Sequence, residues 1–75
     1  MKISARNALR GKVKSIKKGG ESCEVVIEVA AGVDVVSIVS PDSIAELELA
    51  VGKEALAVFK ASDTMVGIPH HKRGE

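Results

Sequence analysis

The sequence predicts an all-β domain, in which five short antiparallel strands form a partly open barrel with one short helix between the third and fourth strands. Three observations predict this fold. Short runs rich in valine and isoleucine alternate with polar residues, as residues in strands do. Glycine-containing turns separate these runs. The chain has 75 residues, which leaves no room for the helical crossovers that a parallel sheet needs.

The first two strands are predicted to form a hairpin. Residues 12–17 alternate valine with lysine until Ile16 breaks the period, which indicates a bulge or a strong twist at Ile16. Gly19 and Gly20 mark the turn. Residues 21–29 give the clearest strand pattern in the chain. The residues that share one face of this strand are Cys23, Val25, Ile27 and Val29.

The third predicted strand, residues 33–39, follows a turn at Ala31 and Gly32. It is apolar on both faces apart from Asp34 and Ser37. A strand without a polar face is covered on both sides. Because the chain is so small, we expect the second cover to be another subunit.

A helix start follows the third strand. Ser40 is a good N-cap and Pro41 suits the first helical position. Ile44 and Leu47 then lie one turn apart, and we expect both to face the core.

Two further strands are predicted after the helix, at residues 55–59 and 62–66, with a turn at Val51 and Gly52 before the first of them. This order of elements matches the oligonucleotide/oligosaccharide-binding (OB) fold. We expect one domain over residues 1–67 and a polar, mobile tail over residues 68–75.

Size and composition favour self-association. Hydrophobic residues make up 45% of the chain, yet Phe59 is the only aromatic residue and Cys23 the only cysteine. A domain of this size is marginally stable alone, and a single cysteine allows no internal disulfide. Subunit interfaces are therefore the expected cover for the surplus of apolar side chains.

Charge and targeting signals exclude several classes of function. The formal net charge is +1, whereas nucleic-acid-binding domains usually carry a basic excess. No export signal and no apolar stretch of membrane-spanning length are visible. We therefore expect a cytoplasmic protein without a nucleic-acid or membrane partner.

Two short segments carry the chemistry of an oxyanion site. Ser4-Ala5-Arg6-Asn7 and Lys60-Ala61-Ser62 each place a cation beside small hydrogen-bond donors. A buried dianion needs a donor for each oxygen and a cation to offset its charge. The segments form one site only if the fold or a neighbouring subunit brings them together.

These segments, together with several other short stretches, resemble the molbindins, first called molybdenum-pterin-binding proteins and known as the single-domain form of the transport-associated OB (TOBE) domain. The resemblance spans residues 1–67. The other stretches that carry it are Ile3, Leu9, Gly11-Lys12-Val13, Ile16-Lys17-Lys18-Gly19, Glu24-Val25, Ile38-Val39-Ser40, Asp42-Ser43, Leu47, Gly52, Ala57-Val58-Phe59 and Asp63.

The resemblance implies a homohexamer, a trimer of dimers, that binds molybdate and usually tungstate between subunits. It implies storage or buffering of the anion, without catalysis and without a catalytic cofactor. The implied ligands are Ser4, Ala5, Arg6, Asn7, Lys60, Ala61 and Ser62, which bind anion oxygens with no direct bond to the metal. A second class of site near the assembly axis maps to Gly20 and Ser37.

Less specific interpretations remain for several of these residues. Ser4, Asn7 and Ser62 are residue types that also bond their own backbone at turns and strand ends. Gly19 and Gly20 are better explained by a hairpin turn than by a phosphate-binding loop, because no GK[ST] motif follows.

Three other features also have a structural explanation. Four lysines, Lys12, Lys14, Lys17 and Lys18, are typical of a solvated strand face, because no aromatic side chain accompanies them for base stacking. Cys23 is expected to be a buried, inert thiol. His70 and His71 could bind a metal ion, but adjacent histidines on a mobile tail are poorly organised for it. We expect no catalytic histidine or paired carboxylates, and so no enzyme activity.

Overall fold

The computed structural model describes residues 7–69. It contains one curled, four-stranded antiparallel sheet in the order β3-β2-β1-β4. The strands are β1 (Asn7–Lys18), β2 (Cys23–Ala30), β3 (Val33–Val39) and β4 (Glu54–Phe59). Helix α1 (Pro41–Leu47) lies between β3 and β4, and a 3₁₀ turn, η1 (Ala61–Asp63), follows β4. The sheet is a half-barrel, and the fifth strand predicted for residues 62–66 is wrong.

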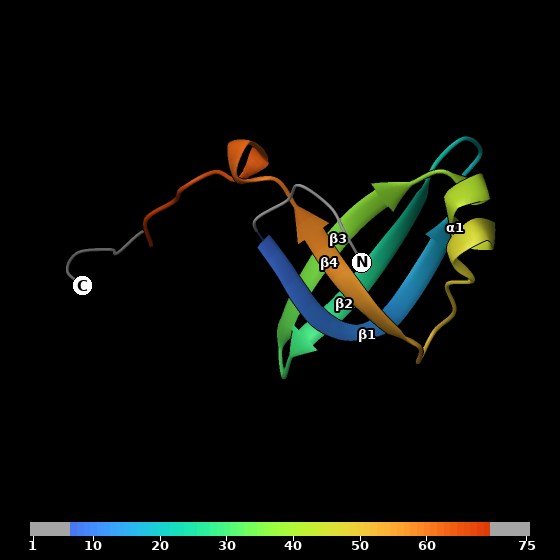
Figure 1. Ribbon diagram of the computed structural model, residues 1–75, viewed down its shortest axis with the longest axis horizontal. Coiled ribbons are helices and arrows are strands. Elements are labelled where there is room, and N and C mark those ends of the chain that lie inside the picture. The colour runs from blue at the N-terminus through green and yellow to red at the C-terminus, as the bar shows by residue number, and fades with distance from the viewer. Residues whose placement is uncertain (1–6, 70–75) are drawn as a thin grey trace.

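Strand β1 joins the two halves of this sheet. Its first half pairs with β4, from Asn7 opposite Phe59 to Lys12 opposite Glu54. Its second half pairs with β2, and Figure 1 shows how strongly the strand bends between them. Gly11 lies at the bend, where a Cβ atom would overlap the carbonyl of Glu28. A glycine is therefore required for β1 to pass this close to the backbone of β2.

The predicted bulge exists, but not at Ile16. Val13 pairs with Ile27 and Ser15 with Val26, so Lys14 is the extra residue. Because of this extra residue, the alternation of inward and outward side chains along β1 shifts by one position after Lys14. Val13 and Ile16 both point inward as a result, which is the break in period seen in the sequence.

A small core lies inside the curl. Its buried members are Val13, Cys23, Val25, Ile27 and Ala57. The predicted inner face of β2 and the buried Cys23 are thus confirmed, except that Val29 is half-buried because it is the extra residue of a second irregularity, between β2 and β3.

Helix α1 closes one end of the sheet (Figure 1). The predicted N-cap is confirmed, because the Ser40 hydroxyl accepts a hydrogen bond of 3.1 Å from the Ser43 N–H. Ile44 packs against the core. Leu47 does not, since it remains 65% exposed. The helix ends one residue later at Glu48, which adopts a left-handed conformation, and no further turn carries Leu47 inward.

The segment predicted as a fifth strand leaves the body of the protein instead. The N–H groups of Asp63 and Thr64 bond back to the carbonyls of Lys60 and Ala61, which forms η1. Residues 64–69 then continue without regular structure (Figure 1). A strand needs a partner for its backbone, and within residues 7–69 none lies beside this segment. In this part of the chain, no helix is long and apolar enough to cross a membrane.

Candidate functional site

The start of β1 and the end of β4 lie side by side. Asn7 is the first residue of β1 and pairs with Phe59, the last residue of β4. Lys60 follows Phe59 directly. The chain therefore enters β1 beside the point where it leaves β4. Asn7, the last residue of the first predicted segment, lies close in the backbone to Lys60, the first residue of the second.

The local geometry after β4 leaves donors available. Lys60 is extended, at φ −76° and ψ 146°, and its carbonyl accepts hydrogen bonds from the N–H of Asp63 at 3.0 Å and the hydroxyl of Thr64 at 3.1 Å. The first N–H groups of a 3₁₀ turn have no partner inside it. Those of Ala61 and Ser62 are therefore free of the turn, and both residues are exposed, as is Lys60.

The other predicted ligands divide into two groups. Asn7 lies within β1 and is half-buried. Ser4, Ala5 and Arg6 lie outside the described residues, as do His70 and His71. Of the first predicted segment, the structure therefore shows only Asn7 close to the start of the second segment at Lys60.

The residues predicted for a second site lie in different places. Gly20 is exposed in the turn between β1 and β2, with open space around it. Ser37 is half-buried on β3, where it pairs with Val25. Ser37 lines a groove to which Gly20 does not contribute. Neither of the two pockets found among residues 7–69 is lined by both residues, and this assignment stays a prediction.

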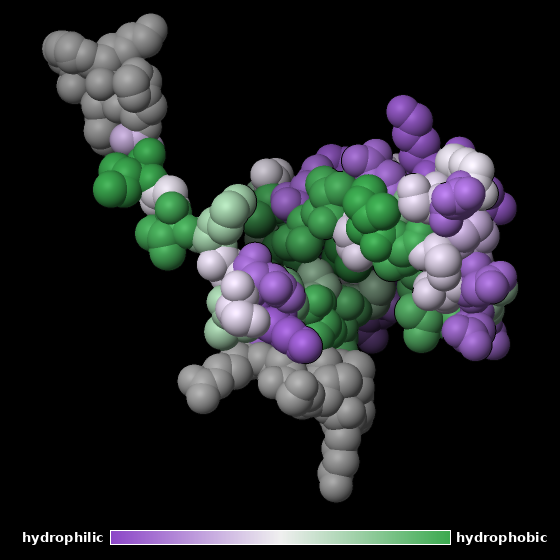
Figure 2. All heavy atoms as spheres, turned by 90° about the horizontal axis from the view of Figure 1, so that it is seen from above, coloured by the Kyte–Doolittle hydropathy of each residue, from purple (hydrophilic) through white to green (hydrophobic). Residues whose placement is uncertain are grey.

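That groove, which we call the edge groove, was not predicted. It is an open hollow of about 910 Å³ between the two edge strands, β3 and β4. Its apolar lining includes Val36, Ile38, Leu47, Leu56 and Val58, all of which are exposed. Figure 2 shows such apolar side chains gathered on one side of the body. The two-sided apolar pattern of residues 33–39 was the one sequence signal for it.

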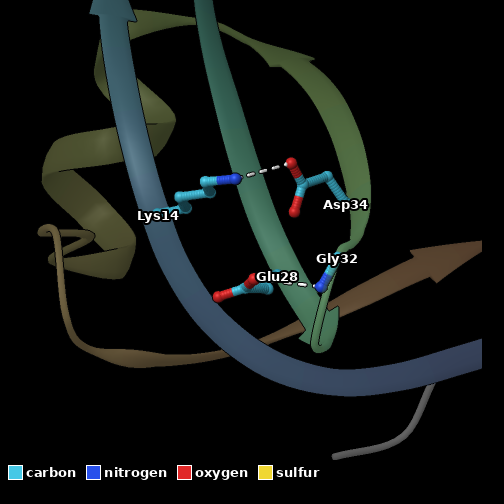
Figure 3. Close-up of polar contacts among 4 residues, drawn as sticks. All are labelled: Lys14, Glu28, Gly32 and Asp34. Carbon is cyan, nitrogen blue, oxygen red and sulfur yellow. Dashed lines mark hydrogen bonds and ion pairs between the residues drawn. The ribbon is translucent and has the colours of Figure 1, made fainter.

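One part of the outer face of the sheet is charged. The Lys14 ammonium on β1 donates to the Asp34 carboxylate on β3 at 3.0 Å, and the Gly32 N–H donates to Glu28 at 3.4 Å (Figure 3). The bond to Asp34, with the charge of that carboxylate, raises the pKa of Lys14. All four lysines of the predicted stripe are exposed, and acidic partners on β2 and β3 interrupt it.

Among residues 7–69, no group of three or more histidine, cysteine, aspartate or glutamate side chains is placed to hold a metal ion. The chemistry that the described site offers is hydrogen-bond donation and positive charge.

Comparison with known proteins gives a consistent family. The TOBE-domain family model matches residues 3–66. Molybdenum-pterin-binding protein 3 of Clostridium pasteurianum is 52% identical over 66 residues, which cover 88% of this chain and 97% of that protein. The molybdenum transport protein ModE of Azotobacter vinelandii is 39% identical over 66 residues, which cover 88% of this chain but 24% of that protein.

Solved structures agree with the fold. MopII from Clostridium pasteurianum, in an apo form, superposes with a TM-score of 0.82 at 48% identity, covering 89% of this chain and all (100%) of that one. The cytoplasmic molybdate-binding protein ModG, with molybdate bound, superposes with a TM-score of 0.85 at 40% identity, covering 92% of this chain and 49% of that one. The match in both sequence and fold extends over nearly the whole described chain, and so this protein belongs to the TOBE-domain family and, within it, to the molybdenum-pterin-binding proteins, or molbindins.

Proposed function

We propose that this protein binds molybdate, and also tungstate, reversibly in the cytoplasm and acts as a store or buffer for the anion. The binding sites lie between subunits of a hexamer built as a trimer of dimers. The ligands are the backbone and side-chain donors of Ser4, Ala5, Arg6, Asn7, Lys60, Ala61 and Ser62. The protein carries the anion unchanged, without catalysis.

The pairing of Asn7 with Phe59 carries this proposal. Paired Cα atoms on antiparallel strands are about 5 Å apart, and each further residue adds at most about 3.8 Å. Covalent geometry alone therefore keeps the Cα atoms of Arg6 and Lys60 within about 13 Å of each other. That is close enough for two long cationic side chains to reach one anion.

The residue types suit a tetrahedral dianion. Arg6 offers a planar fork of donors with a permanent charge. The small residues on both segments let backbone N–H groups approach the oxygens. A site made only of donors disfavours phosphate, because the proton that phosphate keeps at neutral pH would face another hydrogen.

A thermal-shift experiment tests the proposal. A ligand that binds only the folded assembly raises its melting temperature by mass action. We expect molybdate to raise the melting temperature of the wild type, and Arg6→Ala to remove most of that gain. Arg10→Ala is the matched control, because Arg10 pairs with Glu54 at 3.4 Å and both side chains are largely exposed. Equal gains in melting temperature for the wild type and Arg6→Ala would contradict the assigned role of Arg6. If molybdate did not raise the melting temperature of the wild type, the proposed molybdate binding would be contradicted.

Similarity to ModE favours a second candidate function. There the matching segment is 24% of a molybdenum transport protein, so a domain of this kind also occurs as part of a larger protein. The alternative is an oxyanion-sensing or interaction module that serves molybdate transport. Native mass spectrometry of the protein purified from its own cells distinguishes the two. A homohexamer loaded with anion supports a store, whereas a stable complex with another protein supports a sensing module.

A further inference from the structure

A threonine shortly after β4 closes the turn that follows the strand. The Thr64 hydroxyl donates a hydrogen bond of 3.1 Å to the Lys60 carbonyl, and the Thr64 N–H donates one of 3.2 Å to the Ala61 carbonyl. Within residues 7–69, the bond from the Thr64 hydroxyl is the one side-chain hydrogen bond that reaches Asn7 or the Lys60–Ser62 segment. Thr64 is not among the predicted ligands, yet its hydroxyl bonds to the backbone of one of them.

The Lys60 carbonyl is held by two donors. Besides the Thr64 hydroxyl, the Asp63 N–H donates to it at 3.0 Å. A backbone carbonyl has two lone pairs, so the turn uses both of them. The orientation of this carbonyl is therefore fixed by one bond from the backbone and one from a side chain.

The orientation of the carbonyl sets the orientation of the next N–H group. A trans peptide bond is planar, so its C=O and N–H point in opposite directions, and none of the described peptide bonds is cis. Because the Lys60 carbonyl points into the turn, the Ala61 N–H points out of it. The bond from the Thr64 N–H fixes the Ala61 carbonyl in the same manner, so the Ser62 N–H also points out of the turn. Both N–H groups are donors in the oxyanion site proposed above.

The hydroxyl of Thr64 is not available to an anion while it holds the turn. A threonine hydroxyl has one proton to donate, and this proton is used in the bond to the Lys60 carbonyl. An oxyanion needs donors for its oxygens. Thr64 is therefore suited to position the backbone and not to bind the anion.

The turn is short enough for one hydrogen bond to matter. η1 has 3 residues, and hydrogen bonds in a 3₁₀ turn have poorer geometry than those in an α-helix. Residues 61–64 are exposed, so packing contributes little to holding the turn. Loss of the hydroxyl lowers the fraction of molecules in which the turn is formed. The apparent Kd of a ligand rises in inverse proportion to the fraction of molecules that is competent to bind it.

We infer that Thr64 is a positioning residue for the oxyanion site. Its hydroxyl holds the turn after β4 and so keeps the N–H groups of Ala61 and Ser62 directed at the anion. This inference rests on the proposed function, from which it takes the site. It adds a residue that lies outside both predicted ligand segments and acts only through the backbone.

Two variants separate the hydroxyl from the rest of the side chain. Thr64→Val keeps the β-branched shape but lacks the donor, whereas Thr64→Ser keeps the donor. Without oxyanion, we expect the Asp63 amide to exchange its hydrogen faster in Thr64→Val than in the wild type, as measured by NMR. In Thr64→Ser it should exchange as in the wild type. An unchanged exchange rate in Thr64→Val would overturn the inference.

Titration with molybdate by isothermal calorimetry gives the binding readout. We expect the Kd of Thr64→Val to be about threefold to tenfold higher than that of the wild type, and Thr64→Ser to restore most of the affinity. Circular dichroism checks that the sheet is retained, as expected because Thr64 lies outside it. Equal affinities of the wild type and Thr64→Val, or equal losses in the two variants, would overturn the inference and leave the proposed function in place. A wild type that binds no molybdate would overturn both.

Discussion

Strand β2 keeps its large apolar residues buried or half-buried within one chain, whereas the edge strands β3 and β4 leave many of theirs exposed. Val25 on β2 is 1% exposed, while Val36 on the neighbouring β3 is 55% exposed. The two residues have the same side chain and lie on adjacent strands. The difference teaches that apolar residues in strands of one sheet stabilise the single chain to different degrees, according to how much of each side chain the fold covers.

The largest expected effect comes from the bend of β1. Gly11→Ala places a Cβ atom against the Glu28 carbonyl, and both strands must shift to admit it. We expect a loss of about 2 to 3 kcal/mol in the free energy of unfolding, measured by urea denaturation. Gly20→Ala is the control, because nothing lies within 4 Å of the added atom. Equal losses for the two variants would show that β1 does not depend on close passage at Gly11.

The second prediction compares the interior with the edge directly. Val25→Ala leaves a cavity in the core and should cost about 2 kcal/mol. Val36→Ala removes the same two methyl groups from an exposed position, and we expect a change below about 0.5 kcal/mol. Both are measured by urea denaturation at concentrations where the protein is a single chain. If Val36→Ala cost as much as Val25→Ala, β3 would be part of the interior.

The smallest expected effect lies on the outer face. The pKa of Lys14 is raised by Asp34, so the pair stabilises the fold while Lys14 is charged. That contribution is complete below the ordinary lysine pKa of 10.5 and is lost as the pH rises through the higher pKa of the folded state. We expect Lys14→Gln to lower the melting temperature slightly at neutral pH and not at all above the folded pKa.

Lys17→Gln is the control for this prediction. Lys17 is also exposed, and no ion pair to it is seen among residues 7–69. A Lys14→Gln effect that did not change with pH would come from packing of the side chain and not from its charge.

Local signals in the sequence predicted much of this fold. The third strand has the predicted bounds of 33 and 39, and the hairpin turn and the Ser40 cap occur where expected. Each depends on residues close together in the chain. The sequence indicates the bulge at Ile16 and not at Lys14, because the alternation of apolar and polar residues changes only beyond the extra residue.

Other features depend on contacts that are distant in sequence or lie outside the single chain. Residues 62–66 were predicted to form a strand, but a strand forms only where a free edge of a sheet pairs with it. Leu47 fits a helical period, yet the helix ends before its side chain can be covered. For the candidate site, the sequence supplied the residue types, and the pairing of Asn7 with Phe59 supplied their nearness.

The dual role of β1 also has a kinetic consequence. The β1–β2 and β2–β3 pairs join neighbouring segments, whereas β4 must find the first residues of β1 from almost the far end of the described chain. Closing a long loop slows folding. The three-stranded meander should therefore form early, and docking of β4 should be the late step. Until then, the ends of β1 and β4 stay apart, and any function that needs them together must wait for that last step.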